Sequence, residues 1–273
     1  MVVIIVGGHG GTGKTSQLLG IAEMPDYQPV IWGVLEQKDT RSIRAVAERN
    51  EGRFYYDKLY ATFPREHRDL DGELDQFMID PHKTLENVQT WRDRLLSMPN
   101  PEDVKMIVLD GIGDIRGLAT EDWLWQFNVE MRRREPHGKL REAIGKNDAA
   151  AWSEVNSRTK SLIEPLMNFV YENEHVALFM TAQMHDLFVK SERVGEELDL
   201  KNWLEYPAET IIMLERDLDK GTGEFHFNLE CTKVPLWAGE PFVVKNIPKT
   251  YGLLAALTEH GLLPVDENKD SEQ

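Results

Sequence analysis

The hydrophobic positions along the chain form short continuous apolar runs, separated by stretches of helical spacing. The apolar runs cover residues 2–6, 30–35, 106–109 and 176–180. Runs of this kind, rich in Val, Ile and Leu, are typical of strands buried on both faces of a parallel sheet. Within residues 85–95 and 152–170, apolar residues instead recur three or four positions apart, which indicates helices. Strands that alternate with helices predict right-handed βαβ units and an α/β fold, with a mostly parallel central sheet flanked by helices.

The pattern changes in the last third of the chain. Residues 210–214 form a further apolar run, and Lys220-Gly221-Thr222-Gly223 is a turn signal. From Phe225 to Cys231, apolar residues then alternate with polar ones, as in a strand with one buried face. We therefore expect antiparallel strands that extend the sheet near the C-terminus.

One large domain accounts for most of the chain, whose 273 residues suffice for one large α/β domain or two small ones. We expect this domain to cover residues 1–250, with long loops or insertions at 112–150 and 184–203. A C-terminal segment, 251–273, follows it. The polar and acidic end of this segment is predicted to be disordered, because it has few apolar residues to bury.

Composition limits the cellular setting and the kinds of site. The single cysteine, Cys231, excludes a disulfide framework and a thiolate-based structural zinc site. No apolar run approaches the roughly 20 residues that cross a bilayer, and no signal peptide precedes the first strand. We therefore expect a soluble, cytoplasmic protein without a membrane partner. The net charge of −16 argues against broad electrostatic attraction to nucleic acid or anionic lipid, but leaves room for local basic loops.

The segment between the first strand and the helix that follows it matches the phosphate-binding pattern G-x-x-x-x-G-K-[ST] in full. The glycines allow backbone N–H groups to turn toward phosphates, and the helix N-terminus adds a positive dipole. Lys14 is expected to bridge the β- and γ-phosphates of ATP, and the Thr15 hydroxyl to ligate Mg²⁺. We interpret His9 as a tolerated loop residue, without a catalytic role. The residues expected to contact the nucleotide are Gly8, His9, Gly10, Gly11, Thr12, Gly13, Lys14, Thr15 and Ser16.

Polar side chains at the ends of three further strands are candidates for the chemistry. Asp110 ends the strand 106–109 and can hold Mg²⁺ through water. Gly111 follows it, where many ATPases have a catalytic glutamate, so we look for the base elsewhere. Glu36 ends the second strand, which can lie beside the first, and its carboxylate could orient the attacking water. Gln183 ends the fourth strand, where an amide can reach the γ-phosphate and signal its loss.

Together these residues resemble the RecA-like ATPases. In that family the catalytic Glu, the metal-binding Asp and a γ-phosphate-sensing Gln end the second, third and fourth strands, as Glu36, Asp110 and Gln183 do here. The segment from Thr232 to Val244 is similar to a late segment of the family whose lysine reaches the ATP of the neighbouring subunit. The resemblance therefore implies a homo-oligomer with Lys233 as an intersubunit finger, and Lys245 as the second candidate.

The resemblance covers roughly residues 1 to 250. Two features of the chain narrow it to a subgroup of the family. The phosphate-binding loop lies almost at Met1, and a Trp-Ser-Glu-Val-Asn segment at residues 152–156 opens the long helix before Gln183. Both are similar to compact RecA-like ATPases of phages and archaeal viruses, which are linked to single-strand annealing and recombination. This implies a virus-encoded protein acting in the host cytoplasm. The chain lacks the N-terminal oligomerisation segment and the large C-terminal domain of RecA, so the resemblance does not imply RecA-type filaments.

RecA-like proteins bind single-stranded DNA through loops after the third and fourth strands. The first such region here, residues 123–146, combines tryptophans with basic residues, which suits phosphates and stacked bases. An amphipathic helical insertion with core tryptophans and solvated arginines explains the same residues equally well. The second region, 184–203, is acidic on balance, so a lid or a subunit contact is at least as well supported there. The basic residues of the first region are Arg132, Arg133, Arg134, Lys139, Arg141 and Lys146.

The leading hypothesis is an ATPase that acts on single-stranded DNA in recombination, replication or repair. A small-molecule or nucleotide kinase is a second hypothesis, with Arg132–Arg134 as the only candidate for its lid. A DNA-packaging or assembly ATPase is a third, and a module that binds nucleotide without hydrolysis is a fourth. The pattern leaves open the choice between ATP and GTP, although no guanine-selective N-K-x-D motif is visible.

Overall fold

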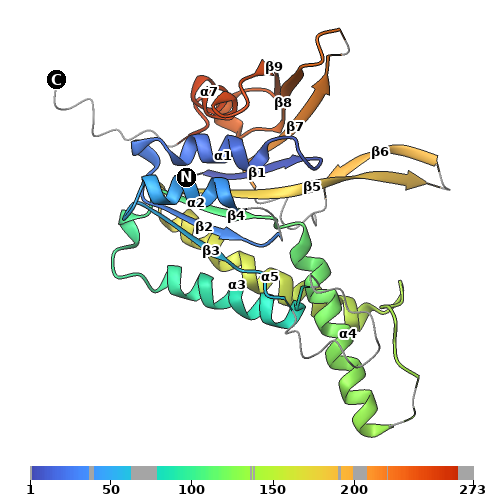
Figure 1. Cartoon of the computed structure of the whole chain (residues 1–273). Helices are drawn as coiled ribbons and strands as arrows, with labels where there is room; N and C mark the ends of the chain where they lie inside the picture. The colour runs from blue at the N-terminus through green and yellow to red at the C-terminus, as the bar shows by residue number, and fades with distance from the viewer. Residues whose placement is uncertain are drawn as a thin grey trace.

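The apolar runs of the sequence form the middle strands of a central sheet, and helices cover both of its faces (Figure 1). The computed structural model describes residues 2–36, 40–62, 79–135, 137, 139–189, 192–198, 208–219 and 221–263. The strands are β1 (Val2–Gly8), β2 (Val30–Val34), β3 (Phe54–Lys58), β4 (Met106–Asp110), β5 (Ala177–Val189), β6 (Glu192–Leu198), β7 (Thr210–Leu218), β8 (Phe225–Lys233) and β9 (Phe242–Ile247). The helices are α1 (Lys14–Ala22), α2 (Arg41–Arg49), α3 (Pro81–Leu96), α4 (Asp114–Arg134), α5 (Ala149–Glu172) and α7 (Gly252–Glu259), with short 3-10 turns at Pro25–Tyr27, Pro101–Asp103 and Leu236–Ala238.

The nine strands follow the order β3-β2-β4-β5-β1-β7-β8-β9, with β6 paired to β5. Neighbouring strands from β3 to β7 are parallel, whereas β8 and β9 are antiparallel additions. The α/β fold with a mostly parallel sheet and antiparallel strands near the C-terminus is therefore confirmed. The expectation that the strand before Glu36 can lie beside the first strand is wrong, because β4 and β5 separate β2 from β1.

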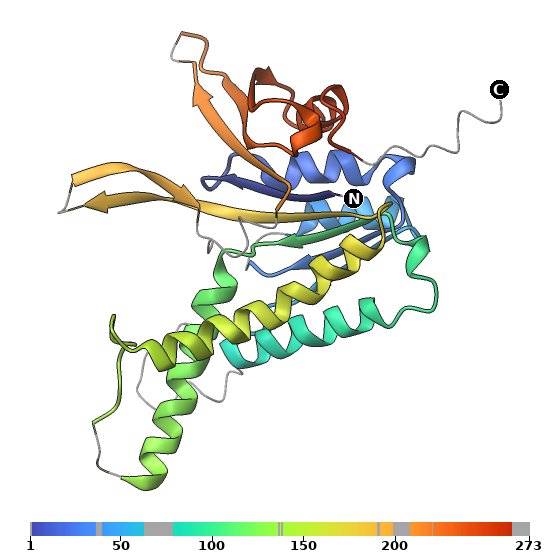
Figure 2. The same cartoon turned by 180° about the vertical axis from the view of Figure 1, so that it is seen from behind.

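Alternate side chains of the buried strands point into two separate hydrophobic clusters. On one face, β1 residues such as Ile4 pack with α1, α2 and α7. On the other face, residues such as Ile5 pack with α3, α5 and the first turns of α4. Figure 2 shows α3 and α5 side by side beneath the sheet, and α4 leaving it at a steep angle. Because all parallel strands end at the same edge, this edge collects the loops that carry the candidate residues.

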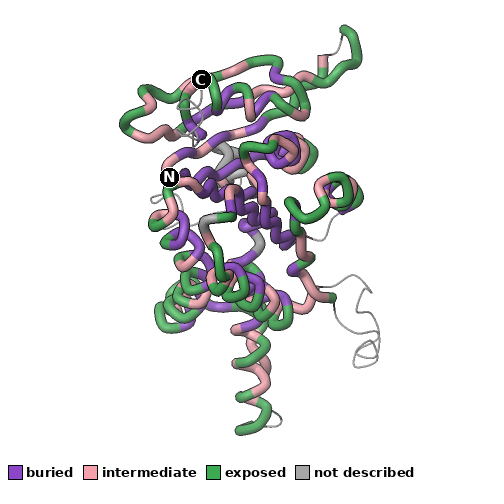
Figure 3. The backbone as a smooth tube through the Cα atoms, turned by 90° about the vertical axis from the view of Figure 1, so that its left-hand side faces the viewer, coloured by how far each residue is buried: buried purple, intermediate pink, exposed green. Residues whose placement is uncertain are grey.

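The structure adds detail to three parts of the expected pattern. Strand β3 and helix α2 were not foreseen, since both are short and rich in polar residues. The region 112–150, expected as a long loop or an insertion, holds helix α4, and Figure 3 shows the far end of this helix without buried residues. The region 184–203 begins as a β-hairpin, because β5 runs on to Val189 and pairs with β6. The expected domain limits remain predictions.

The C-terminal segment joins the core through helix α7. Gln17 of α1 is fully buried; its amide donates to the Pro248 carbonyl and its oxygen accepts from the Leu253 N–H. Residues 266–273, where disorder was predicted, lie outside the described residues. Among the residues that are described, no helix combines the length and apolar character that crossing a membrane requires.

Cys231 offers a direct probe of the added antiparallel strands. Its side chain is fully buried in β8, and burial raises the pKa of the thiol to about 11. Since only the thiolate is nucleophilic, we expect iodoacetamide at pH 8 to label the native protein at least about 100-fold more slowly than the urea-unfolded protein, whose thiol has an ordinary pKa. Equal rates, measured by mass spectrometry of the alkylated chain, would show that β8 opens readily and contradict its place in the core.

Candidate functional site

The phosphate-binding loop connects β1 to α1 with two residues in the left-handed backbone region. Gly11 and Gly13 have φ angles of 79° and 88°, which are strained for residues with a Cβ. Gly13 is the N-cap of α1, so the first backbone N–H groups of the helix have no intrahelical partner and face the loop. Thr12 closes the turn, as its hydroxyl donates to the His9 carbonyl at 2.9 Å. This backbone conformation suits an anion at the helix N-terminus.

Lys14 brings a positive charge to the same loop. Its side chain is only 7% exposed, and its ammonium donates to the carbonyls of Gly8 at 2.5 Å and His9 at 3.1 Å. These contacts hold the ammonium close to the helix N-terminus. Both favour a phosphate at this position. Ser16, the last of the expected nucleotide contacts, is half-buried in the first turn of α1.

Asp110 connects the loop to two neighbouring strands. Its carboxylate is almost fully buried; Oδ2 accepts from the Thr15 hydroxyl at 3.2 Å and Oδ1 from the Thr181 hydroxyl at 2.6 Å. The Thr181 hydroxyl in turn accepts from the Gly111 N–H at 2.8 Å. Thr181 was not foreseen as a site residue, although its register opposite Asp110 across β4 and β5 explains its role.

The oxygens of Thr15 and Asp110 suit Mg²⁺. This hard cation prefers oxygen ligands, and it is usually held by one or two protein groups together with phosphates and water. Within the described residues, no group of three or more His, Cys, Asp or Glu side chains could hold a metal ion by itself. The two residues thus fit a cation that the nucleotide helps to bind, and their binding of Mg²⁺ stays a prediction.

Glu36 and Gln183 meet at the same edge although β4 separates their strands. The Gln183 amide donates to the Glu36 carboxylate at 3.3 Å, and both side chains are half-buried. Glu36 passes over Gly111, since a Cβ built on Gly111 would lie 2.4 Å from the Glu36 Cγ. The glycine at position 111 therefore leaves room for Glu36. Glu36 fills the space beside Asp110 where other ATPases have a glutamate on the following residue.

Lys233 lies away from the loop of its own chain. It pairs in register with Ile211, which pairs with Ile5 in the middle of β1. Burial raises the pKa of the nearby Glu209 carboxyl, and the charge of Lys233 opposes this shift. Lys245 is exposed on the edge strand β9. The structure thus brings Lys14, Thr15, Asp110, Glu36 and Gln183 together and leaves both late lysines outside this group.

Helix α4 carries much of the basic and aromatic region 123–146. Trp123 stacks on Phe127, and the Arg141 guanidinium lies over both rings. Trp123 also donates to Glu154 of α5, so it has a structural role. Trp125 is 59% exposed. In the described part of the region, the exposed cations are Arg132, Arg133, Arg134, Lys139 and Lys146.

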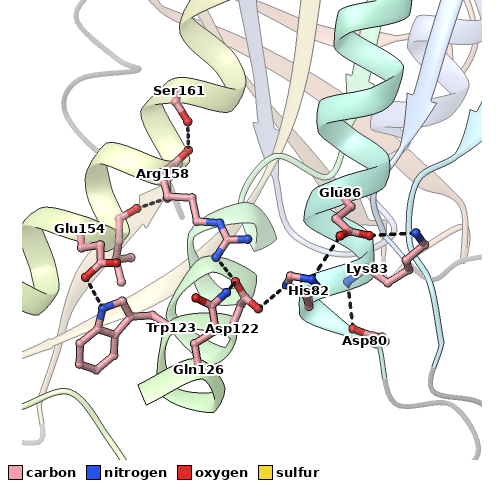
Figure 4. Close-up of polar contacts among 12 residues, drawn as sticks. Asp80, His82, Lys83, Glu86, Asp122, Trp123, Gln126, Glu154, Arg158 and Ser161 are labelled. Atoms are coloured by element: carbon pink, nitrogen blue, oxygen red, sulfur yellow. Dashed lines mark hydrogen bonds and ion pairs between the residues drawn. The ribbon is translucent and has the colours of Figure 1, made fainter. Parts of the chain in front are cut away.

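A polar cluster holds the base of α4 against α3 and α5 (Figure 4). Its centre is the buried carboxylate of Asp122, which accepts from Arg158 of α5 and from Gln126 one turn later. His82 at the start of α3 contacts the same carboxylate at 3.0 Å and Glu86 at 3.2 Å. A buried charge needs such partners, so this cluster sets the direction in which α4 leaves the core.

The second expected DNA-binding region can be described only in its backbone. Residues 184–189 and 192–198 form the β5–β6 hairpin, which projects from the same side of the sheet as α4 (Figures 1 and 2). Lys190, Lys201 and Trp203 lie outside the described residues.

Comparison with known proteins gives a weak similarity in structure. No protein-family model matches the sequence, and no curated protein matches it. The chain is similar to the RadB recombinase, with 13% identity and a TM-score of 0.47 over 92% of this chain and 89% of that one. It is also similar to the KaiC-like protein PH0186 from Pyrococcus horikoshii, with 14% identity and a TM-score of 0.45 over 92% of this chain and 87% of that one. Because both TM-scores lie below 0.5, we base the functional interpretation on the geometry of the site.

Proposed function

We propose that this chain is a RecA-like ATPase that binds Mg-ATP, hydrolyses it and acts on single-stranded DNA in recombination, replication or repair. The contact between Glu36 and Gln183, beside Asp110 and the phosphate-binding loop, is the observation that supports hydrolysis most directly. A binding module without turnover would need no carboxylate there. The assignment to the phage and archaeal-virus group and to the cytoplasm remains part of this proposal.

The chemistry assigned to the residues is an attack of water on the γ-phosphorus. The Glu36 carboxylate orients the water and accepts its proton, and the bond from the γ-phosphorus to the β,γ-bridging oxygen breaks, which releases ADP and phosphate. Lys14 neutralises negative charge on the β- and γ-phosphates. Thr15 and Asp110 would hold Mg²⁺, which would supply further positive charge to stabilise the phosphates during the reaction. Gln183 contacts Glu36 directly. A shift of Glu36 when the γ-phosphate leaves can therefore be transmitted along β5 to the β5–β6 hairpin.

The exposed face of α4 is the proposed site for single-stranded DNA. Trp125 offers a face for base stacking, and Arg132 to Arg134 offer charges for phosphates. Glu130 pairs with Arg133 and Arg134 and weakens this charge, so we expect few contacts. The proposed assembly is a homo-oligomer in which Lys233 reaches the ATP of a neighbour, which its position away from the loop of its own chain supports.

Steady-state ATPase activity without DNA, with single-stranded DNA and with duplex DNA, at two salt concentrations, tests this proposal. We expect stimulation by single strands that weakens as salt rises, because phosphate contacts release counterions. Trp125→Ala should lower the affinity for single strands about tenfold and leave basal hydrolysis unchanged. Tyr55→Ala, an exposed aromatic residue on β3, is the matched control and should change neither.

The other outcomes of this assay point to the alternative functions. Stimulation by duplex DNA alone would favour a packaging ATPase. Phosphate transfer to an added nucleoside or nucleotide, without a response to DNA, would favour a kinase. ATP binding without phosphate release would show a non-hydrolysing module. Each of these results would contradict the proposed action on single strands.

A further inference from the structure

Arg216, a residue that no motif marks, lies against the phosphate-binding loop. Strand β7 runs parallel to β1, with Met213 opposite Gly7, and continues past the end of β1. Arg216 follows three residues after Met213, and its side chain lies beside the loop. A Cβ built on Gly11 would lie 3.1 Å from its Nη1 and 3.4 Å from its Cζ. The guanidinium therefore lies beside the middle of the loop, where a side chain at position 11 would crowd it.

Two phenylalanines of β8 support this position. The Arg216 guanidinium lies 4.5 Å from the centre of the Phe225 ring, which orients the planar group by a cation–π contact. Phe227 is the cross-strand neighbour of Arg216, and its ring lies 3.5 Å from where a Cβ on Gly13 would be. The β7–β8 hairpin thus presents a cation and an aromatic ring to two glycines of the loop.

Arg216 has no acidic partner among the described residues. None of their carboxylates forms an ion pair with it, and its guanidinium lies over the Phe225 ring and beside Gly11 of the loop. The adjacent Glu215 and Asp217 point to the opposite face of the strand, as successive side chains do. A guanidinium fixed by a ring and without a carboxylate can give its fork of N–H donors to a phosphate, the anion whose geometry it matches.

We propose that Arg216 binds the terminal phosphates of the nucleotide held by its own chain. The inference rests on the proposed function, and it adds a cation that acts in cis. Lys14 approaches the phosphates from the helix side of the loop, whereas Arg216 approaches from the β7–β8 hairpin. The positive charge needed when the γ-phosphate leaves is then present in a single chain, before any lysine of a neighbour arrives.

The first experiment compares Arg216→Ala and Arg216→Lys with wild type in ATP turnover and in the dissociation constants of ATP and ADP. We expect Arg216→Ala to lower kcat by about 10²–10³-fold, as loss of one transition-state donor does, and Arg216→Lys to restore part of it. Affinity should fall for ATP and change little for ADP. Arg44→Ala, an exposed arginine on α2, is the matched control and should leave all three values unchanged.

The same measurements separate failure of this inference from failure of the proposed function. An unchanged kcat in Arg216→Ala, with active wild type, would overturn the role of Arg216 alone. Equal losses of ATP and ADP affinity would also overturn it, since they would assign Arg216 to the base or the inner phosphate. If wild type binds ATP without hydrolysing it, the proposed function fails, and a selective loss of ATP affinity in the variant still supports Arg216.

Mixing inactive variants distinguishes action in cis from action in trans. An equimolar mixture of Arg216→Ala and Glu36→Gln chains should stay inactive, because no chain holds both residues. Recovery of activity would show that Arg216 serves a neighbouring site and would overturn the inference. The mixture of Lys233→Ala with Glu36→Gln is the comparison, since a lysine that acts in trans restores activity at mixed interfaces.

Discussion

Glu36→Gln is expected to leave the affinity for ATP unchanged and to lower the turnover number about 10²–10⁴-fold. The substitution keeps the shape of the side chain and an oxygen that can still accept from the Gln183 amide, so the local geometry should survive. It removes the negative charge that orients the attacking water and accepts its proton. The dissociation constant of ATP from calorimetry and phosphate release under saturating ATP check the two halves of this prediction.

Glu48→Gln is the matched control for this change. Glu48 lies on α2, is largely exposed, and forms an ion pair with Arg44 one turn earlier. Exposed pairs of this kind contribute little, so turnover and ATP affinity should both equal those of wild type. If Glu36→Gln hydrolyses ATP as fast as this control does, Glu36 is not the base, and the proposed mechanism is wrong.

The candidate site could be predicted largely because it lies at strand ends. Apolar runs identify buried parallel strands, and such strands end at one edge of the sheet, so Asp110 and Gln183 had to come near the loop at Lys14. The order of the strands could not be predicted in this way. Glu36 was expected to come from a strand beside β1, yet it reaches the site from two strands further away by crossing over Gly111.

Arg216 and Thr181 show why the rest of the site was missed. The apolar pattern of β7 stops at Leu214, because residues 215–218 extend beyond the core and are exposed. A hydrophobic pattern cannot identify the part of a strand that extends beyond the hydrophobic core, so the sequence pattern did not assign Arg216 to any element. Thr181 is one residue in a buried strand, and only the register of β5 with β4 shows that it contacts Asp110. Both residues depend on strand pairing, which a single sequence does not encode locally.

Gly111→Ala should abolish ATP hydrolysis without touching the phosphate-binding loop. The new Cβ would lie 2.4 Å from the Glu36 Cγ and 3.0 Å from the Glu36 backbone nitrogen, so Glu36 must leave its position. Gly111 also has a φ of 101°, where a residue with a Cβ is strained, and this costs about 1–3 kcal/mol of stability. We expect turnover to fall as far as in Glu36→Gln, and the thermal midpoint to fall as well.

Gly117→Ala, at an exposed position in the first turn of α4, is the control that separates stability from chemistry. Nothing lies within 4 Å of a Cβ at Gly117, and alanine in a helix interior is about 0.5–1 kcal/mol more favourable than glycine. This variant should hydrolyse ATP as wild type does and melt slightly higher. In Gly111→Ala, ATP binding measured well below the melting temperature should persist while turnover is lost. Normal turnover there would mean that the space beside Asp110 does not have to be filled by Glu36, and the arrangement that supports hydrolysis would have to be abandoned.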